Sequence, residues 1–168
     1  SVAEERFITE KEAEEGKYRE IKKLKERNYF FKMSGYQDDL IAHIESHPKF
    51  ILPAARRNEI LSFLKNPLND LCISRPKSRL KWGIEIPFDE NYVTYVWFDA
   101  LLNYITAVGW GQDEKLFNKW WPAEYHLIGK DILTTHTVYW TTMLLAGGIP
   151  LPKSVFAHGF WLSGASKM

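Results

Sequence analysis

Two short stretches contain residues that could form a ligand-binding site. Gly129-Lys130-Asp131 follows an apolar run, where the N–H groups at the start of a helix can bind an anion and glycine lets a ligand approach the backbone. Asp131 could accept a hydrogen bond from a ribose hydroxyl or cap the helix, and both interpretations stay open. His158-Gly159 lies towards the end of another apolar run, which is also a favourable position for a binding site.

A second group is aromatic. If a helix begins early enough, Trp97, Ala100 and Tyr104 share one of its faces. A pocket walled by Trp97, Tyr104 and His136 would be apolar with two polar tips. Such a pocket suits an apolar ligand of medium size, and a thioether gains about 0.3–1.5 kcal/mol from an aromatic contact. The alternative is that His136 is a core histidine whose ring is satisfied within the protein.

A third group is cationic. Arg75 is followed by Lys77, Arg79 and Lys81, and then by Trp82-Gly83. These cations could clamp phosphate or RNA. A charged loop beside a hairpin explains the same pattern equally well.

The other histidines have plainer interpretations. His43 and His47 lie four residues apart on an expected helix, but without a complete ligand set we interpret them as surface residues and not as a metal pair. His126 begins a stretch that resembles an H-x-G-H signature, yet Lys130 follows Gly129 where the second histidine would be needed. We therefore expect His126 to be a strand residue with a satisfied ring.

The elements that must position these groups form an alternating pattern. Three apolar runs, at 92–98, 125–128 and 155–160, each lead into a helical pattern or a loop. Helices are expected near 100–107 and 131–146. Strands that alternate with helices in this way indicate βαβ units, so we predict an α/β fold with a parallel sheet.

The segment before these units is also expected to be structured. Residues 29–33 form an apolar strand, and Ser34 can cap a helix that continues to Ile44. Pro53 opens a second helix, which Asn66-Pro67 ends.

Composition excludes several classes of protein. The chain has 168 residues, a formal charge of +1 and one cysteine, Cys72. A disulfide scaffold and a multi-cysteine zinc site are therefore excluded, and the near-zero charge provides no bulk field for nucleic acid. No apolar run is long enough to span a bilayer, so no membrane partner is expected. Residues 1–28 hold 16 of the 43 charged side chains, which suits an exposed helix or an RNA-binding arm.

Taken together, the motifs resemble those of class I aminoacyl-tRNA synthetases, and within that class the methionyl-tRNA synthetases. The most specific part is YVWFDALLNYI followed by HLIGKDILTTH. Further matching stretches occur in family order and extend the resemblance over residues 28–168: NYFFKMSGYQDDL, RRNEILSFL, DLCISRPKSRLKWGIEIPFD and VFAHGFWLSGASKM.

The resemblance implies a domain organisation. Residues 29–168 would be the second half of a Rossmann-like catalytic domain, and residues 1–28 the end of its connective segment. Zinc-knuckle cysteine pairs are absent, so we expect no zinc or other metal site. Lys167-Met168 would begin the family's mobile K-M-S-K-S loop. We expect the half that carries H-x-G-H, and the anticodon-binding domain, to lie outside this chain.

The resemblance also implies a role for individual residues. The catalytic residues would be Arg75, in the activation step, and Lys167, on the triphosphate. The methionine pocket would contain Trp97, Ala100, Leu101, Tyr104 and His136. The ATP-binding residues would be Gly129, Asp131 on the ribose, His158, Gly159, Trp161 and again Lys167.

The implied activity is that of a methionine–tRNA ligase in translation. Its substrates would be methionine, ATP with Mg2+, and tRNA(Met), in the cytoplasm of a bacterium or, alternatively, in a mitochondrion. We expect the chain alone to be inactive. Two alternatives stay open: a relative that activates leucine, isoleucine, valine or cysteine, and a non-catalytic RNA-binding paralogue.

Overall fold

The structure is a computed structural model that describes residues 13, 14, 16, 21, 26–164 and 166–167. The charged helix expected within residues 1–28 therefore lies almost entirely outside the described residues. No helix of the described part is both long and apolar enough to cross a membrane.

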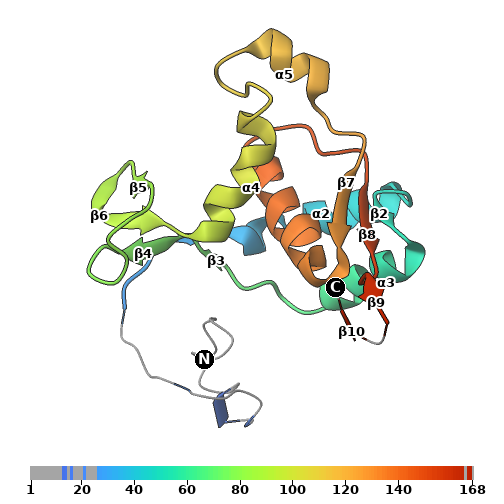
Figure 1. Ribbon diagram of the computed structural model, residues 1–168, viewed down its shortest axis with the longest axis horizontal. Helices are drawn as coiled ribbons and strands as arrows, with labels where there is room; N and C mark the ends of the chain where they lie inside the picture. Colours follow the sequence, from blue (N-terminus) through green and yellow to red (C-terminus); the bar gives the residue numbers. More distant parts are fainter. Residues whose placement is uncertain (1–12, 15, 17–20, 22–25, 165, 168) are drawn as a thin grey trace.

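A three-stranded parallel sheet runs along one side of the molecule. It has the order β2 (Ile51–Leu52), β8 (Val155–His158), β7 (His126–Gly129) (Figure 1). Side chains alternate between its two faces, as a pleated strand requires. Ile128, Val155 and Ala157 are buried against helices, whereas Leu127 on the opposite face is 70% exposed.

Two of the three apolar runs predicted as strands, 125–128 and 155–160, do contain strands of the parallel sheet. The third run, at 92–98, does not form a strand of this sheet. The chain forms β6 (Asp89–Thr94) and then turns into α4 (Val96–Thr106) after Tyr95. β6 pairs antiparallel with β4 (Ser74–Pro76) and β5 (Glu85–Ile86) in a separate sheet. The misleading feature is that one apolar run contains both the end of a strand and the start of a helix.

Helices cover the buried face of the parallel sheet. A 3-10 turn, Met33–Tyr36, leads into α2 (Gln37–Ser46), and α3 (Ala54–Phe63) follows Pro53. The expected cap at Ser34 is wrong: its hydroxyl donates to Asp70 Oδ1 at 2.7 Å, and no side chain accepts from the first N–H groups of α2. Apolar side chains of these helices form one core with the sheet, including Leu40, Ile44, Ile60, Ile128 and Val155.

The strand predicted at 29–33 is shorter in the structure. β1 (Phe30–Phe31) pairs antiparallel with β3 (Leu71–Cys72).

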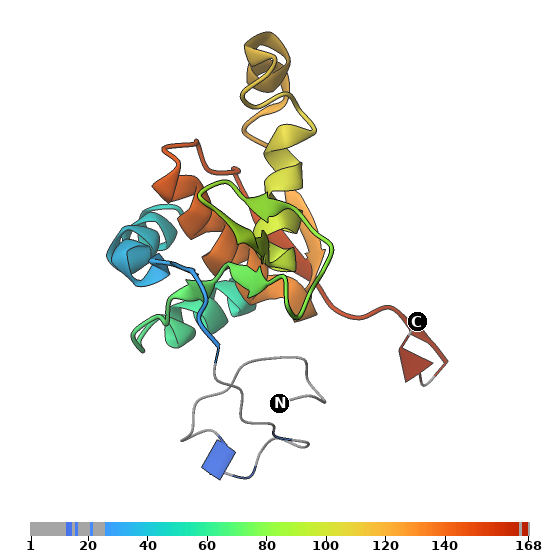
Figure 2. The ribbon, with the colours of Figure 1, turned by 90° about the vertical axis from the view of Figure 1, so that its left-hand side faces the viewer.

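α5 (Glu114–Trp120) is capped by Asp113, whose side chain accepts from the N–H of Leu116 at 2.9 Å. Figure 2 shows α5 projecting at one end of the molecule, while the hairpin of β9 (Leu162–Ser163) and β10 (Ser166–Lys167) extends away from its body.

The helix expected at 131–146 is present but irregular. It begins with a 3-10 turn, Lys130–Ile132, continues through a π-helical segment, Thr135–Trp140, and ends as α6 (Thr141–Ala146). Short π-helical segments within helices are frequent at functional sites. This segment buries His136 and Trp140, and Trp140 belongs to a second core, called here the aromatic core, that also contains Leu101 and Trp121.

Candidate functional site

The two nucleotide-binding candidates meet at the carboxyl ends of neighbouring parallel strands. Gly129 ends β7, His158 ends β8, and the two residues are register partners. Ligands of open α/β sheets bind at this edge. The structure therefore brings Gly129, Asp131, His158 and Gly159 to one edge of the sheet.

The side chain of Asp131 folds back over Gly129, two residues before it. A Cβ atom added at Gly129 would lie 2.6 Å from Asp131 Oδ1, so only glycine leaves room for this arrangement. Asp131 lies inside the 3-10 turn, and Gly129 is the N-cap residue of that turn. No side chain forms a capping hydrogen bond there. The carboxylate is exposed at the sheet edge. The ribose interpretation of Asp131 stays a prediction.

Aromatic rings surround the same edge. Lys130 Nζ lies 4.6 Å from the centre of the Phe160 ring, so a cation–π contact joins the segments that follow β7 and β8. The rings of His158 and Trp161 meet edge to face at 6.4 Å, and Trp161 is 73% exposed. His158 Nδ1 donates to the carbonyl of Gly159 at 2.6 Å. The edge thus presents flat apolar surface beside polar groups, which is what a purine ring requires.

Tyr104 and His136 form a hydrogen-bonded pair. The ring of His136 is buried, and its Nδ1 donates to the carbonyl of Ile132 at 3.0 Å. Its Nε2 is therefore the acceptor for the Tyr104 hydroxyl at 2.9 Å. Burial lowers the pKa of His136, which favours this neutral ring. The ring of His136 thus matches the alternative interpretation, a core histidine whose ring is satisfied within the protein. Its partner Tyr104, in contrast, is 37% exposed.

His126 supports this pair, a role that the sequence analysis missed. It is a buried strand residue with a satisfied ring, as expected, since Trp140 Nε1 donates to its Nε2 at 3.1 Å. Its ring also packs against Tyr104, with centroids 4.4 Å apart. Burial, together with the neighbouring His136, lowers the pKa of His126 to about 4. Its place on the inner face of β7, two residues before Ile128, was the available signal.

The other residues expected in the methionine pocket lie on α4. This helix does begin early, at Val96, so Trp97, Ala100 and Tyr104 share a face as predicted. Trp97 is half-buried and Ala100 is exposed. Leu101 is fully buried in the aromatic core, so it packs beneath that face.

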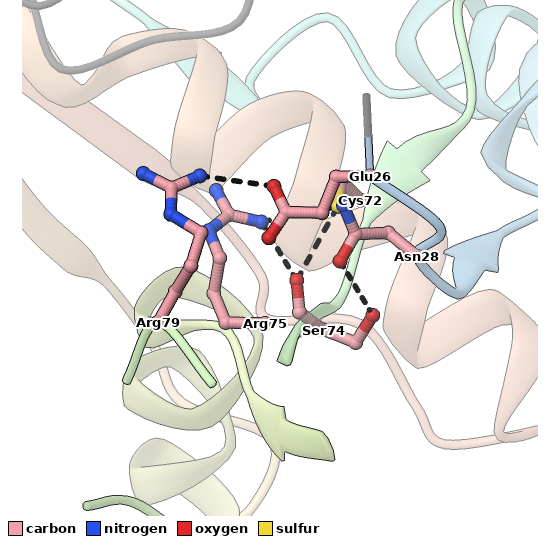
Figure 3. A network of polar contacts seen from close by, with 6 residues as sticks. All are labelled: Glu26, Asn28, Cys72, Ser74, Arg75 and Arg79. Carbon is pink, nitrogen blue, oxygen red and sulfur yellow. Dashed lines mark hydrogen bonds and ion pairs between the residues drawn. The ribbon is translucent and has the colours of Figure 1, made fainter. Parts of the chain in front are cut away.

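Arg75 is folded against its own strand in the antiparallel sheet. Its Nη1 donates to the carbonyl of Ser74 at 2.7 Å and to Cys72 Sγ at 3.1 Å (Figure 3). The guanidinium carbon lies 4.1 Å from the centre of the Tyr95 ring, a contact that sequence spacing did not indicate. Tyr95 directly precedes α4, so this contact joins Arg75 to the helix that carries Trp97.

Two of the three cations after Arg75 are paired within the protein. Lys77 forms an ion pair with Glu85, and Arg79 forms one with Glu26. These pairs favour the charged loop over the phosphate or RNA clamp for residues 77–81.

The remaining candidates from the sequence are Lys167 and the pair His43 and His47. The backbone of Lys167 pairs with Leu162 in the β9–β10 hairpin, and its side chain lies outside what the structure describes. The rings of His43 and His47 stack at 4.2 Å, and His43 also packs on Phe50. Across the described residues there is no group of three or more His, Cys, Asp or Glu side chains placed to hold a metal ion.

Comparisons with solved structures agree with this geometry. The crystal structure of Mycobacterium tuberculosis methionyl-tRNA synthetase bound by methionyl-adenylate has a TM-score of 0.76 and 48% identity, over 80% of this chain and 26% of that one. Its apo form has a TM-score of 0.78 and 48% identity, over 82% of this chain and 28% of that one. The expected α/β fold of a class I synthetase is thereby confirmed.

Comparisons of sequence extend the likeness to nearly the whole chain. The methionine–tRNA ligase of Clostridium acetobutylicum is 55% identical over 170 residues, which cover 98% of this chain and 26% of that protein. That of Thermotoga maritima is 49% identical and covers 95% of this chain and 24% of its own length. The chain thus spans about a quarter of the length of these relatives. A family model described as tRNA synthetases class I (M) matches residues 7–168, and the chain therefore belongs to the class I methionyl-tRNA synthetase family.

Proposed function

We propose that this chain supplies the methionine and adenylate side of the catalytic site of a methionine–tRNA ligase. The observation that carries the proposal is a physical link between its two parts. His136 donates to the carbonyl of Ile132, which belongs to the same 3-10 turn as Asp131. The Tyr104–His136 pair and the sheet edge at Gly129 and His158 therefore belong to one continuous site.

The proposed reaction has two steps. A carboxylate oxygen of methionine attacks the α-phosphorus of ATP, the bond from that phosphorus to the bridging oxygen breaks, and pyrophosphate leaves. The 3′-terminal ribose hydroxyl of the tRNA then attacks the acyl carbon, loses its proton and releases AMP. Such a reaction needs little covalent chemistry from the protein, so positioning and charge stabilisation carry it.

The chain's residues divide between the two substrates. Trp97, Ala100, Tyr104 and His136 would form the methionine pocket, with Leu101 packed behind it. A pocket that differs by one methylene discriminates by only about 1–3 kcal/mol, so contact between aromatic rings and the sulfur would add selectivity. ATP, as its Mg2+ complex, would bind residues at the sheet edge and on the last hairpin: Gly129, Asp131, His158, Gly159, Trp161 and Lys167. Arg75 would stabilise the negative charge of the activation step.

The proposed activity requires parts of the enzyme that this sequence does not contain. An H-x-G-H motif is absent from the sequence. Among the described residues β7 pairs only with β8, and the outer face of the sheet exposes Leu127 and Phe156. Parallel sheets are normally covered on both faces, so this face suits the catalytic half that carries H-x-G-H. Residues 1–28 would be the end of the connective segment, and the tRNA anticodon would bind a further domain. The bacterial relatives favour the cytoplasm of a bacterium as the place of action.

A thermal-shift panel tests the choice of amino acid. Residues 1–168 are grafted into the Clostridium acetobutylicum relative in place of the matching segment, which gives what we call the grafted enzyme. Methionine should raise its melting temperature, whereas leucine, isoleucine, valine and cysteine at the same concentration should not. A shift by one of those four in place of methionine would favour a relative of different specificity. No shift with any amino acid or with ATP, while the unmodified relative responds, would favour a non-catalytic paralogue.

A further inference from the structure

Glu26 carries a buried carboxylate oxygen that no hydrogen bond satisfies. Its side chain is only 10% exposed, and its Oε2 accepts from Arg79 Nη1 at 2.9 Å. Its Oε1 is fully buried and has no hydrogen-bond partner among the described residues. Buried polar atoms are rarely left in this state, and one that is calls for an explanation such as a functional role.

The surroundings of this carboxylate are strongly cationic. Figure 3 shows it pointing toward the guanidinium groups of Arg75 and Arg79. A carboxylate has two oxygens and about four acceptor positions, so it can receive more than one guanidinium. The ion pair with Arg79 uses one oxygen and leaves the other on the side of Arg75.

The backbone around Glu26 is attached to the strand that carries Arg75. The Asn28 amide and the Ser74 hydroxyl lie 3.2 Å apart in a hydrogen bond, and the N–H of Tyr29 donates to the same hydroxyl at 2.7 Å. Ser74 is itself fully buried in β4 and directly precedes Arg75. The position of Glu26 relative to Arg75 is therefore set by contacts that do not depend on either side chain.

Arg75 has donors suited to this acceptor. Both of its bonds to Ser74 and Cys72 come from Nη1. A guanidinium carries five N–H donors in a rigid planar fork. A guanidinium group whose one edge is hydrogen-bonded to a carboxylate keeps a fixed orientation, and its other edge can then bind a ligand.

We infer that Glu26 is a positioning residue for Arg75: its buried Oε1 accepts from the Arg75 guanidinium during methionine activation, while Arg79 holds Oε2 in place. This inference rests on the proposed function, because Arg75 then acts on negative charge in the activation step. It assigns to the last residues of the proposed connective segment an influence on the chemistry that is exerted through Arg75.

Pyrophosphate exchange by the grafted enzyme tests this role. Glu26→Gln should lower kcat by roughly 10-fold, because a hydrogen bond between charged groups is worth more than a neutral one. The KM values for methionine and ATP should change less than about twofold, since a positioning effect is confined to the transition state. Glu59→Gln is the matched control: it removes an exposed carboxylate that pairs with Arg56, far along the chain from the site, and should leave kcat unchanged.

A double-mutant cycle separates positioning from stability. In an Arg75→Lys background, which removes the planar fork, Glu26→Gln should lower kcat by less than about twofold further, because coupled residues are not additive. The inference is overturned if the two losses multiply independently, or if Glu26→Gln changes only the melting temperature. Failure of the proposed function is recognised separately, because the grafted enzyme without substitutions would then show no exchange.

Discussion

At the residue scale, three side chains determine the character of the proposed methionine pocket. His136 accepts from Tyr104 with one ring nitrogen and donates to Ile132 with the other, so both nitrogens are used within the protein. His126, bonded to Trp140, packs against the face of Tyr104. The hydroxyl of Tyr104 is therefore held by one histidine and its ring by the other. His136 would act on methionine chiefly by orienting Tyr104.

Replacing His136 tests this arrangement. In the grafted enzyme, His136→Ala should raise the KM for methionine by about 10-fold, because the Tyr104 hydroxyl loses its acceptor and the pocket loses a wall. The KM for ATP in pyrophosphate exchange should stay within about twofold. Equal losses for both substrates would mean that His136 is only a core residue. His47→Ala, at an exposed histidine that directly follows α2, serves as the control.

The same histidines predict a dependence of stability on pH. Burial lowers the pKa of His126 to about 4 from its ordinary value of about 6.5. Between these values the unfolded chain binds the proton and the folded chain does not, so stability should fall as the pH falls from about 6.5 to about 4. The linked loss is on the order of 3 kcal/mol, and the lowered pKa of His136 acts in the same direction.

Urea unfolding of the chain at pH 7.5, 5.5 and 4.5 measures this dependence. His126→Gln should reduce the difference in unfolding free energy between the highest and lowest pH, whereas His47→Gln should leave it unchanged. An identical pH profile for His126→Gln and the unsubstituted chain would contradict a neutral, buried His126.

At the element scale, the junction of β7 with the 3-10 turn is the critical connection. The strand delivers Gly129 to the sheet edge, the turn folds Asp131 back over it, and the carbonyl of Ile132 fixes His136. A short π-helical segment then buries His136 and places Trp140 in the aromatic core. One continuous stretch of chain therefore positions both halves of the site.

Gly129→Ala should disturb the nucleotide side alone. The new Cβ would lie 2.6 Å from Asp131 Oδ1, so the carboxylate has to move. Misplacement of one group by about 1 Å can cost up to 100-fold, and we expect the KM for ATP to rise on the order of 10-fold with the KM for methionine little changed. Gly35→Ala is the control, because nothing lies within 4 Å of its added Cβ. An unchanged KM for ATP would show that Asp131 does not bind the nucleotide.

Elements with a clear period and boundary were predictable from the sequence. β7, β8 and the helix after Pro53 follow from apolar runs bounded by turn residues. The third parallel strand, β2, has only two residues and leaves no periodic pattern. The run at 92–98 failed because β-propensity and helix amphipathicity overlap within it, and tertiary pairing with β4 and β5 decides where the strand ends.

The site was predictable to a similar extent. Spacing placed Trp97, Ala100 and Tyr104 on one helix face. The apolar runs marked Gly129 and His158 as separate candidates, and the structure shows that they are register partners. The stacking of Arg75 on Tyr95, the support of Tyr104 by His126 and the burial of Glu26 depend on contacts between distant segments. Such contacts leave no local pattern in a sequence.

At the scale of the whole molecule, the chain carries a site with one open side. The inner face of the parallel sheet is packed by α2 and α3, whereas its outer face exposes Leu127 and Phe156. The chain also corresponds to about a quarter of the length of its relatives. A site that is proposed to bind methionine and adenylate on one side, and that lacks H-x-G-H on the other, should be incomplete by itself.

Methionine-dependent exchange of pyrophosphate into ATP tests this central claim most directly. The grafted enzyme should catalyse exchange with methionine at a rate within about 10-fold of the unmodified relative, since the segment that it replaces is 55% identical to this chain. The 168-residue chain alone should show no exchange above background. Robust exchange by the chain alone, or none by a folded grafted enzyme, would contradict the account.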